Sequence, residues 1–394
     1  MTRSNSSGLG LRYQAVRSQS LALAAPLSPE DQCVQSMPDA SPVKWHLAHT
    51  TWFFETLLLS AHVAGYRCFD EQFATLFNSY YEALGPRYPR AQRGLLTRPD
   101  IGRVHAYRAA VDEAMAGFLA RLDAGDNSEL RPLVELGLNH EQQHQELMLT
   151  DILHLMSCNP MLPAVREGLP PQAQAVADGW HDYEAAQAEV GHGAAGFCFD
   201  NETPPHRVLL QPYSLANRLV TNAEYQAFID DRGYQTPSLW LSEGWAMVQS
   251  QGWRAPLYWL DDQREFNLYG VHRRQADQPV RHLSFHESVA YAEWAQARLP
   301  TEFEWESAVG GANRPEQAFG EVWQWTRSSY DPYPRFRAPA GAVGEYNGKF
   351  MVGQIVLRGS SLATPPGHHR TTYRNFFAPA SRWQFTGLRL ARNL

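Results

Sequence analysis

The chain has 394 residues, and 34 Lys and Arg against 41 Asp and Glu give a formal net charge of −7. At roughly 150 residues per domain, this length predicts two or three domains. A content of 44% hydrophobic and 19% charged residues is that of a globular rather than a disordered protein. The negative balance argues against a nucleic-acid binder held by phosphate contacts. The apolar run Leu21–Leu27 is far shorter than the roughly 20 residues of a membrane span, and it makes a poor signal peptide.

The cysteine and histidine content narrows the search for a site. Four widely spaced cysteines without a CxxC pair predict neither a disulfide framework nor a cysteine zinc site, so we expect a reducing, cytoplasmic location. The chain has 15 His and 12 Trp, which is unusual. Histidines without cysteine pairs direct attention to a metal site built from imidazoles.

The first 170 residues are predicted to form a helical domain. Trp45–His62, Asp100–Asp123 and Leu133–Met156 keep apolar residues at helical spacing, and Arg12–Ala24 is a weaker helix candidate. Long helices without strand signals favour an antiparallel bundle.

The remainder of the chain has a different character, so the predicted fold class is α+β. Residues 171–196 are rich in Gly, Ala and Pro and are predicted to be a linker and the entry to a second domain. We expect residues 197–394 to form a mixed, loop-rich domain. Its predicted strands are Arg207–Leu210, Val356–Arg358 and Gly387–Ala391, and its predicted helices are Asn222–Asp230 and Ser284–Ala297.

The strongest chemical signal is the string from His140 to His144, which reads HEQQH. On a helix, residues i and i+4 project from one face, so both imidazoles can reach one ion. The string matches HExxH, which in metalloproteases means zinc with the glutamate, here Glu141, as general base. The alternative is a pair of histidines on a solvated helix face.

A second predicted helix supplies the missing imidazole. His46 and His49 lie in it, and His49 is one turn from Trp45 and Trp52, on the face that should turn inward. Three imidazoles on facing helices would form a facial set that leaves open positions on the metal. Such a site suits zinc or Fe(II). His49 is the preferred third ligand, and His46 is the alternative.

These residues carry a family resemblance. HLAHTTWFFE followed by HEQQHQE resembles the DinB-type helical domain of the ergothioneine sulfoxide synthases, a non-heme iron enzyme family. The second half resembles the formylglycine-generating-enzyme-like (sulfatase-modifying factor, C-type-lectin-like) domain that follows it there. The supporting strings are DNETPPHRV, VTNAEYQAFI, ARLPTEFEWE, VWQWT, YNGKFM and RTTYRNFF, which span nearly the whole chain in the family's order.

The resemblance implies an enzyme that uses Fe(II) and O2 to join a sulfur donor to the imidazole C2 of hercynine (trimethylhistidine), leaving a sulfoxide. It implies small-molecule substrates and no nucleic-acid or membrane partner. It assigns the metal to His49, His140 and His144. It further implies that Gln143 hydrogen-bonds the substrate imidazole and that Asn375 and Phe376 hold the trimethylammonium end, for which an aromatic face offers a cation–π contact.

The resemblance also implies a tyrosine that supplies a proton or hydrogen atom during O2 reduction. LFNSYYEALGPR resembles the branch with active tyrosines in the helical domain, so Tyr80 and Tyr81 are the candidates, with Tyr80 slightly preferred. Arg87, Arg90 and Arg93 follow as a basic cluster that could receive an anionic donor, or that is simply solvated.

Three departures from the family pattern bear on the donor. Where sulfur-using members would carry RGGSCATP, this chain reads RGSSLATP, with Ser360 and Leu362 in place of Gly and Cys. Val352 stands where some relatives carry Cys. A lost thiol makes sense beside an easily oxidised donor, because a thiol could exchange with it. This resembles the selenoneine synthase branch, which takes a selenosugar and makes a C–Se bond; a core substitution without functional meaning is the alternative.

Other functions remain open from the sequence alone. A zinc hydrolase would use His140, Glu141 and His144, with a third ligand downstream rather than at His49. A DinB-type metal-dependent thiol transferase would explain three histidines but not the second domain. A non-catalytic binding module would hold no metal.

Overall fold

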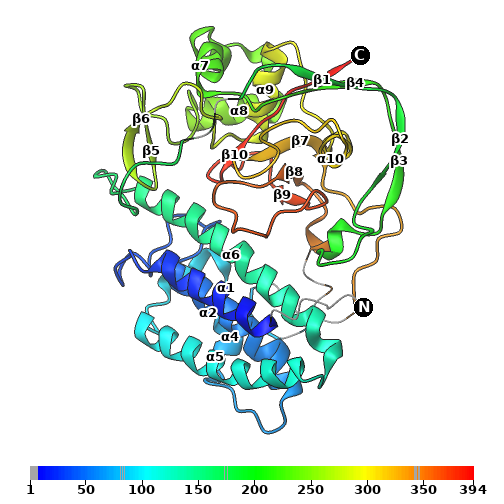
Figure 1. Ribbon diagram of the computed structural model, residues 1–394. Helices are drawn as coiled ribbons and strands as arrows, with labels where there is room; N and C mark the ends of the chain where they lie inside the picture. Colours follow the sequence, from blue (N-terminus) through cyan, green and yellow to red (C-terminus); the bar gives the residue numbers. More distant parts are fainter. Residues whose placement is uncertain are drawn as a thin grey trace. The chain divides into compact units, whose positions relative to one another are not determined.

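The computed structural model describes residues 8–394 apart from 80, 82, 84, 173, 175, 341–343, 345 and 346. The chain divides into two compact units (Figure 1). The first comprises Met1–Pro160 with Ala340–Tyr346, and the second comprises Met161–Pro339 with Asn347–Leu394. The first unit is helical and the second combines helices with short strands, so the predicted α+β class is confirmed.

Four long helices of the first unit pack side by side in the bundle predicted from the sequence (Figure 1). They are α1 (Leu9–Ala24), α2 (Val43–Phe54), α5 (Ile101–Asp123) and α6 (Arg131–Ser157). Short helical pieces join them: α3 (Ser60–His62), α4 (Phe73–Leu76), η3 (Arg90–Leu95) and η4 (Ser128–Leu130). Every residue of α2 is buried, which agrees with the many apolar and aromatic residues around this helix.

The predicted helix 45–62 is not uniform. After α2 the chain continues as a π-helix, η1 (Glu55–Leu59), before α3. The buried Glu55 carboxylate accepts hydrogen bonds from the hydroxyls of Tyr107 (2.6 Å) and Tyr66 (2.9 Å) and from the Phe69 amide (2.8 Å). These partners come from distant positions, so side-chain periodicity gives no sign of the change in helix type.

In its described residues the second unit contains several small sheets and four α-helices (Figure 1). One sheet has the order β10-β7-β8-β9, a second has the order β1-β4-β11, and two hairpin-like pairs join β2 to β3 and β5 to β6. The strands are β1 (Trp180–Tyr183), β2 (Ala186–Val190), β3 (His206–Leu210), β4 (Tyr213–Ala216), β5 (Arg264–Asn267), β6 (Gly270–Arg273), β7 (Trp323–Ser329), β8 (Ile355–Gly359), β9 (Asn375–Phe377), β10 (Thr386–Gly387) and β11 (Ala391–Asn393). The helices are α7 (Asn222–Asp230), α8 (Ser242–Gln251), α9 (Phe285–Trp294) and α10 (Glu302–Gly310).

Both predicted helices of this unit are confirmed. Residues that cap a helix mark their first turns in the sequence. Thr221 and Ser284 cap α7 and α9, each in a reciprocal capping box with a glutamate three residues on. The same device starts α10, which we did not predict, as we did not predict α8. The predicted strand 387–391 is wrong as one element, because β10 and β11 join different sheets on either side of it.

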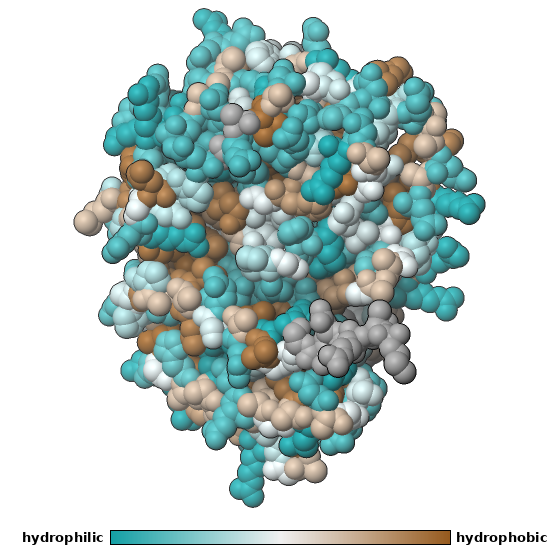
Figure 2. Space-filling model, viewed as in Figure 1, coloured by the Kyte–Doolittle hydropathy of each residue, from teal (hydrophilic) through white to brown (hydrophobic). Residues whose placement is uncertain are grey.

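Residues 171–196, predicted as a linker and entry segment, hold β1 and β2. These strands pair with β4 and β3, partners that lie further along the chain and that local composition cannot reveal. Hydrophilic residues cover most of the face shown in Figure 2. No helix in the described part of the chain has both the length and the apolar character needed to span a membrane.

Candidate metal centre

Three imidazoles from two helices converge inside the first unit. His49 comes from α2, and His140 and His144 come from α6, four residues apart on one face. One ring nitrogen of each lies within 4.8 Å of the others. The Nε2 atoms of His49 and His140 are 3.2 Å apart. Metal–nitrogen bonds of ~2.1 Å would place two ligand nitrogens ~3.0 Å apart at 90° and ~3.4 Å apart at a tetrahedral angle, so the spacing fits a bound ion.

A glycine allows the two ligand helices to approach. Gly137 lies on α6 one turn before His140, and a Cβ there would stand 2.6 Å from a ring carbon of Phe54 and 2.9 Å from one of Phe53. Any side chain at 137 would therefore require these phenylalanine rings or the two helices to shift. The ring of Phe53 also contacts the His140 ring, with centroids 4.8 Å apart.

His49 is held in one orientation by its surroundings. Its Nδ1–H donates to the carbonyl oxygen of Phe77 at 2.6 Å, so the neutral ring carries its lone pair on Nε2. The ring stacks against Trp45 (centroids 4.5 Å apart, 13° between planes) and against Trp52 (5.6 Å, 15°). A backbone carbonyl that fixes the tautomer of a metal-binding histidine is a common supporting contact.

All three imidazoles are neutral at physiological pH. Burial lowers the pKa of His140 to about 3 and, together with the neighbouring His140, moves the pKa of His49 and of His144 well below the ordinary value. Metal binding requires the neutral form. The three imidazoles could therefore bind an ion without first losing a proton.

His46, the alternative ligand, is not part of this group. Its Nδ1 lies 2.8 Å from Nδ1 of His144, and its Nε2 lies 3.0 Å from Oδ2 of Asp151. The structure therefore favours His49 as the third ligand and places His46 behind His144. Asp151 was missed in the sequence, although it lies seven residues after His144 on the same helix face, a spacing that could have indicated it.

Glu141 is not placed to act as a base on an ion held by the three imidazoles. It points into a buried network in which Arg17 and Arg108 each lie 3.0 Å from one of its oxygens, and Ser20 donates to it at 2.6 Å. Burial raises the pKa of Glu141, but Arg17 and Arg108 outweigh this and lower it to about 2. A zinc hydrolase needs this carboxylate at the ion, so the geometry argues against that alternative.

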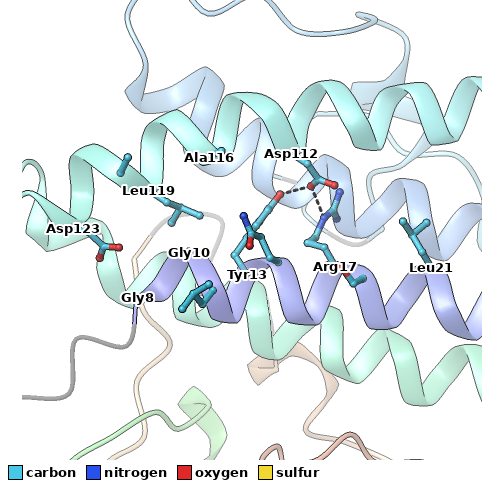
Figure 3. Close-up of a pocket in the computed structure, with 13 residues that line it drawn as sticks. Gly8, Gly10, Tyr13, Arg17, Leu21, Asp112, Ala116, Leu119 and Asp123 are labelled. Atoms are coloured by element: carbon cyan, nitrogen blue, oxygen red, sulfur yellow. Dashed lines mark hydrogen bonds and ion pairs between the residues drawn. The ribbon is translucent and has the colours of Figure 1, made fainter.

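The same network reaches a pocket between α1 and α5. The pocket has a volume of about 450 Å³ and holds none of the candidate site residues. Figure 3 shows Tyr13 and Arg17 converging on Asp112, whose Oδ1 accepts from the Tyr13 hydroxyl at 2.6 Å and from Arg17 Nε at 2.7 Å. Arg17 thus links Asp112 to Glu141, which fixes α1 against both α5 and α6.

One of the two candidate tyrosines contacts Trp52, a ring that stacks on His49. Tyr81 is fully buried, and its ring centroid is 5.6 Å from that of Trp52, which stacks on His49. Asn78 holds the turn: its amide donates to the Tyr81 carbonyl, and its oxygen accepts from the Tyr81 amide. Tyr80 lies outside the described residues.

The three arginines of the basic cluster have different environments. Arg87 and Arg90 are exposed and donate to the carbonyls of Ser79 and Asp39. Arg93 is buried over the Trp45 ring, 3.3 Å from its centroid, and donates to Ser41 at 2.9 Å. Among the described residues it forms no ion pair, and burial together with Arg90 lowers its pKa to about 8.

The remaining candidates are partly exposed. Gln143 lies on α6 between the two metal-site histidines. In the second unit, Asn375 begins β9, and its side chain accepts from the Phe376 amide at 2.9 Å. The Phe376 ring stacks on Tyr330 with centroids 4.0 Å apart, a partner that the sequence did not indicate.

The three residues that depart from the family pattern have different surroundings. Ser360 is buried, and its hydroxyl accepts from the Gly320 amide at 2.8 Å. Leu362 lines a pocket of about 120 Å³ whose walls include Tyr258, Phe266 and Phe385. Val352 is exposed at the surface.

Comparisons with known proteins agree with both units. Residues 12–148 match the DinB superfamily, and residues 171–319 and 315–394 match the sulfatase-modifying factor enzyme 1-like domain. The chain is 33% identical over 405 residues to the hercynine oxygenase of Mycobacterium tuberculosis, covering 91% of this chain and 92% of that protein. It is 32% identical to the hercynine oxygenase of Mycolicibacterium smegmatis, covering 91% and 92%.

A more distant relative is ergothioneine biosynthesis protein 1 of Schizosaccharomyces pombe. It is 25% identical over 227 residues, which cover 50% of this chain and 28% of that protein. Identity above 30% along nearly the full length of both mycobacterial chains shows that these proteins are homologous to this chain. The chain belongs to the hercynine oxygenase family of oxidoreductases.

Proposed function

We propose that this enzyme is an O2-dependent, Fe(II)-dependent catalyst that forms a carbon–chalcogen bond at the imidazole C2 of hercynine. The observation that carries the proposal is the cluster of three buried, neutral imidazoles on α2 and α6 in a chain of the hercynine oxygenase family. When bound there, ferrous iron would supply activation of O2 and a Lewis acid. A three-histidine face leaves coordination positions for substrates.

The protein's own groups would then bind the substrates and move the proton. We propose that Gln143 hydrogen-bonds the hercynine imidazole and that Asn375 and Phe376 hold its trimethylammonium group. The hydroxyl of Tyr81 or Tyr80 would supply the proton. Tyr81 is supported by its contact with Trp52, which stacks on His49.

The donor is proposed to meet the basic cluster. Arg87 and Arg90 are exposed cations, and the buried Arg93 beside them lies over Trp45. With a thiol or a selenol donor the reaction balances in the same way: the C2–H bond and the S–H or Se–H bond break, a C–S or C–Se bond and a sulfoxide or selenoxide oxygen form, and the second oxygen atom of O2 leaves as water.

Of the possible donors, we propose a selenosugar, which would make the product a selenoneine precursor with a C–Se bond. The support is that Leu362 stands where the pattern of the sulfur-using members has a cysteine, so this position lacks a thiol that could exchange with a selenol. The second candidate is cysteine or γ-glutamylcysteine in ergothioneine biosynthesis, which is favoured by the relative named for that pathway.

The test is a competition among donors. Enzyme loaded anaerobically with Fe(II) is given hercynine, O2 and equal concentrations of a selenosugar, cysteine and γ-glutamylcysteine, and the products are identified by mass. We expect a hercynine adduct of the selenosugar to dominate. A dominant thiol adduct would move the assignment to ergothioneine biosynthesis, and no consumption of hercynine with any donor would overturn the proposal.

A further inference from the structure

The metal-site histidine His144 is backed by a buried polar relay that the family assignment does not explain. Behind His144 stands His46, and behind His46 stands Asp151. All three side chains are more than nine-tenths buried. The relay begins on α6, crosses to α2 and returns to α6, so it also ties together the two helices that supply the ligands.

When His46 is neutral, hydrogen-bond chemistry gives this relay a single direction. A carboxylate accepts hydrogen bonds only, so the contact of 3.0 Å to Asp151 Oδ2 requires a proton on Nε2 of His46. Neutral His46 then has an acceptor at Nδ1. The contact of 2.8 Å between the two Nδ1 atoms requires a donor on the His144 side, so His144 carries Nδ1–H and its lone pair lies on Nε2.

Asp151 is itself held in place by the backbone. The Ser41 amide donates to the same Oδ2 atom at 2.8 Å. Ser41 lies just before α2 and also receives the Arg93 hydrogen bond on its hydroxyl. The carboxylate oxygen that orients His46 therefore has a fixed position before any ligand arrives.

We propose that His46 and Asp151 are positioning residues that set the tautomer and ring orientation of His144, so that it presents Nε2 to the metal. The inference rests on the metal centre proposed above. The Phe77 carbonyl fixes the tautomer of His49 in the same way, because it accepts the hydrogen bond from Nδ1–H of that ring. Carboxylate–histidine pairs behind metal ligands commonly change metal affinity by about 10–100-fold.

Four substitutions distinguish the effect of the relay's hydrogen bonds from the effect of the Asp151 charge and from a general loss of packing. Asp151→Leu and His46→Leu remove the relay. Asp151→Asn keeps an oxygen that can accept from both Ser41 and His46 but removes the charge. The comparison variant is His154→Leu on the same helix. The His154 ring hydrogen-bonds Ser36 rather than a member of the relay, and its link to the relay is electrostatic: burial lowers the pKa of His154, and the charge of Asp151 acts to raise it.

The first measurement is anaerobic Co(II) binding to each full-length protein, with the dissociation constant and the visible absorption bands as readouts. We expect the two leucine variants of the relay to bind about 10–100-fold more weakly with altered bands, and Asp151→Asn and the comparison variant to stay within about threefold of wild type. Equal affinity and bands in all variants would overturn the inference, as would an Asp151→Asn protein as weak as Asp151→Leu. No binding by wild type would instead overturn the metal centre.

A second measurement identifies the tautomers in the wild-type protein itself. In protein labelled with ¹⁵N-histidine, long-range proton–nitrogen spectra report which ring nitrogen carries the proton. We expect the Nε2–H form for His46 and the Nδ1–H form for His144, assigned by the signals lost in His46→Leu or in His144→Ala. The opposite tautomer at either ring would overturn the inference.

Discussion

Gly137 of α6 faces the ring of Phe54 of α2 so closely that a Cβ at position 137 would stand 2.6 Å from a ring carbon. Real Cβ atoms do not approach other atoms this closely, so α6 or the ring would have to shift. Because His140 lies one turn after Gly137, this contact sets the distance between the helix that carries His49 and the helix that carries the other two imidazoles.

Gly137→Ala is expected to weaken both the fold and the site. Overpacking of a well-filled core costs about 1–3 kcal/mol, and displacement of α6 would separate the ligand nitrogens. Urea unfolding and Fe(II) affinity measure the two effects. The control is Gly117→Ala on α5, where the nearest foreign atom is 3.9 Å away, and there we expect unchanged or slightly higher stability. Equal behaviour of the two variants would contradict the packing argument.

Glu141→Gln is expected to act on stability rather than chemistry. It would take the carboxylate partner from the buried guanidinium of Arg108 and leave Arg17 with Asp112 alone. Breaking a buried ion pair from one side costs about 3–5 kcal/mol, which urea unfolding would detect. Glu135→Gln, which alters an exposed pair with Arg12, should change stability little. A Glu141→Gln protein with wild-type stability and lost hydrolysis of peptides would support the zinc-hydrolase alternative instead.

Tyr81→Phe is expected to uncouple O2 consumption from product formation, because the ring would still pack on Trp52 while the hydroxyl proton is lost. The measurement is product formed per O2 consumed, with Tyr80→Phe assayed in parallel. Tyr66→Phe serves as the control, since its hydroxyl contacts Glu55 rather than the histidines. If coupling stays at the wild-type level in both Tyr81→Phe and Tyr80→Phe, neither tyrosine is the proton donor.

A buried histidine in the second unit predicts a pH effect on stability. Burial, aided by Arg281, lowers the pKa of His282 to about 3, and its Nδ1–H donates to the Gln384 carbonyl at 2.9 Å. In the unfolded chain the ring titrates near 6.5. Below that pH the unfolded state takes up a proton that the folded state refuses, so stability is present above about pH 6.5 and falls by about 1.4 kcal/mol per pH unit towards pH 3.

His282→Asn should reduce this loss by about 2 kcal/mol between pH 7 and pH 5. Asparagine tolerates the φ of +64° found at position 282. Urea unfolding at the two pH values gives the comparison, and His62→Asn at an exposed position is the control. Parallel losses in wild type and His282→Asn would show that His282 does not contribute.

Much of the fold could be predicted where local signals sufficed. The capped, apolar-periodic segments gave α5, α6, α7 and α9 to within a few residues. The strands β1 and β2 could not be predicted, because their pairing partners lie further along the chain. The π-helix η1 could not be predicted for a related reason. The hydrogen bonds to Glu55, its first residue, come from Tyr66 and Tyr107, which lie outside this helix.

The convergence of His49, His140 and His144 could be predicted because helical spacing and neighbouring tryptophans place them on an inward face. Their supporting groups could not be assigned. The role of Asp151 depends on His46 standing between it and His144, and the role of the Phe77 carbonyl depends on the path of the chain after α4. The ion pair that turns Glu141 away from the imidazoles is made with Arg17 on α1, which lies more than 120 residues away in the sequence.

The central claim is that His49, His140 and His144 together hold one ferrous ion. Anaerobic Fe(II) titration of wild type and of His49→Ala, His140→Ala and His144→Ala tests it most directly, with circular dichroism to verify folding. We expect one tight site per chain in wild type, and the loss of that site in each variant with the helical signal retained. A folded His49→Ala protein that still binds one Fe(II) as tightly as wild type would contradict the account.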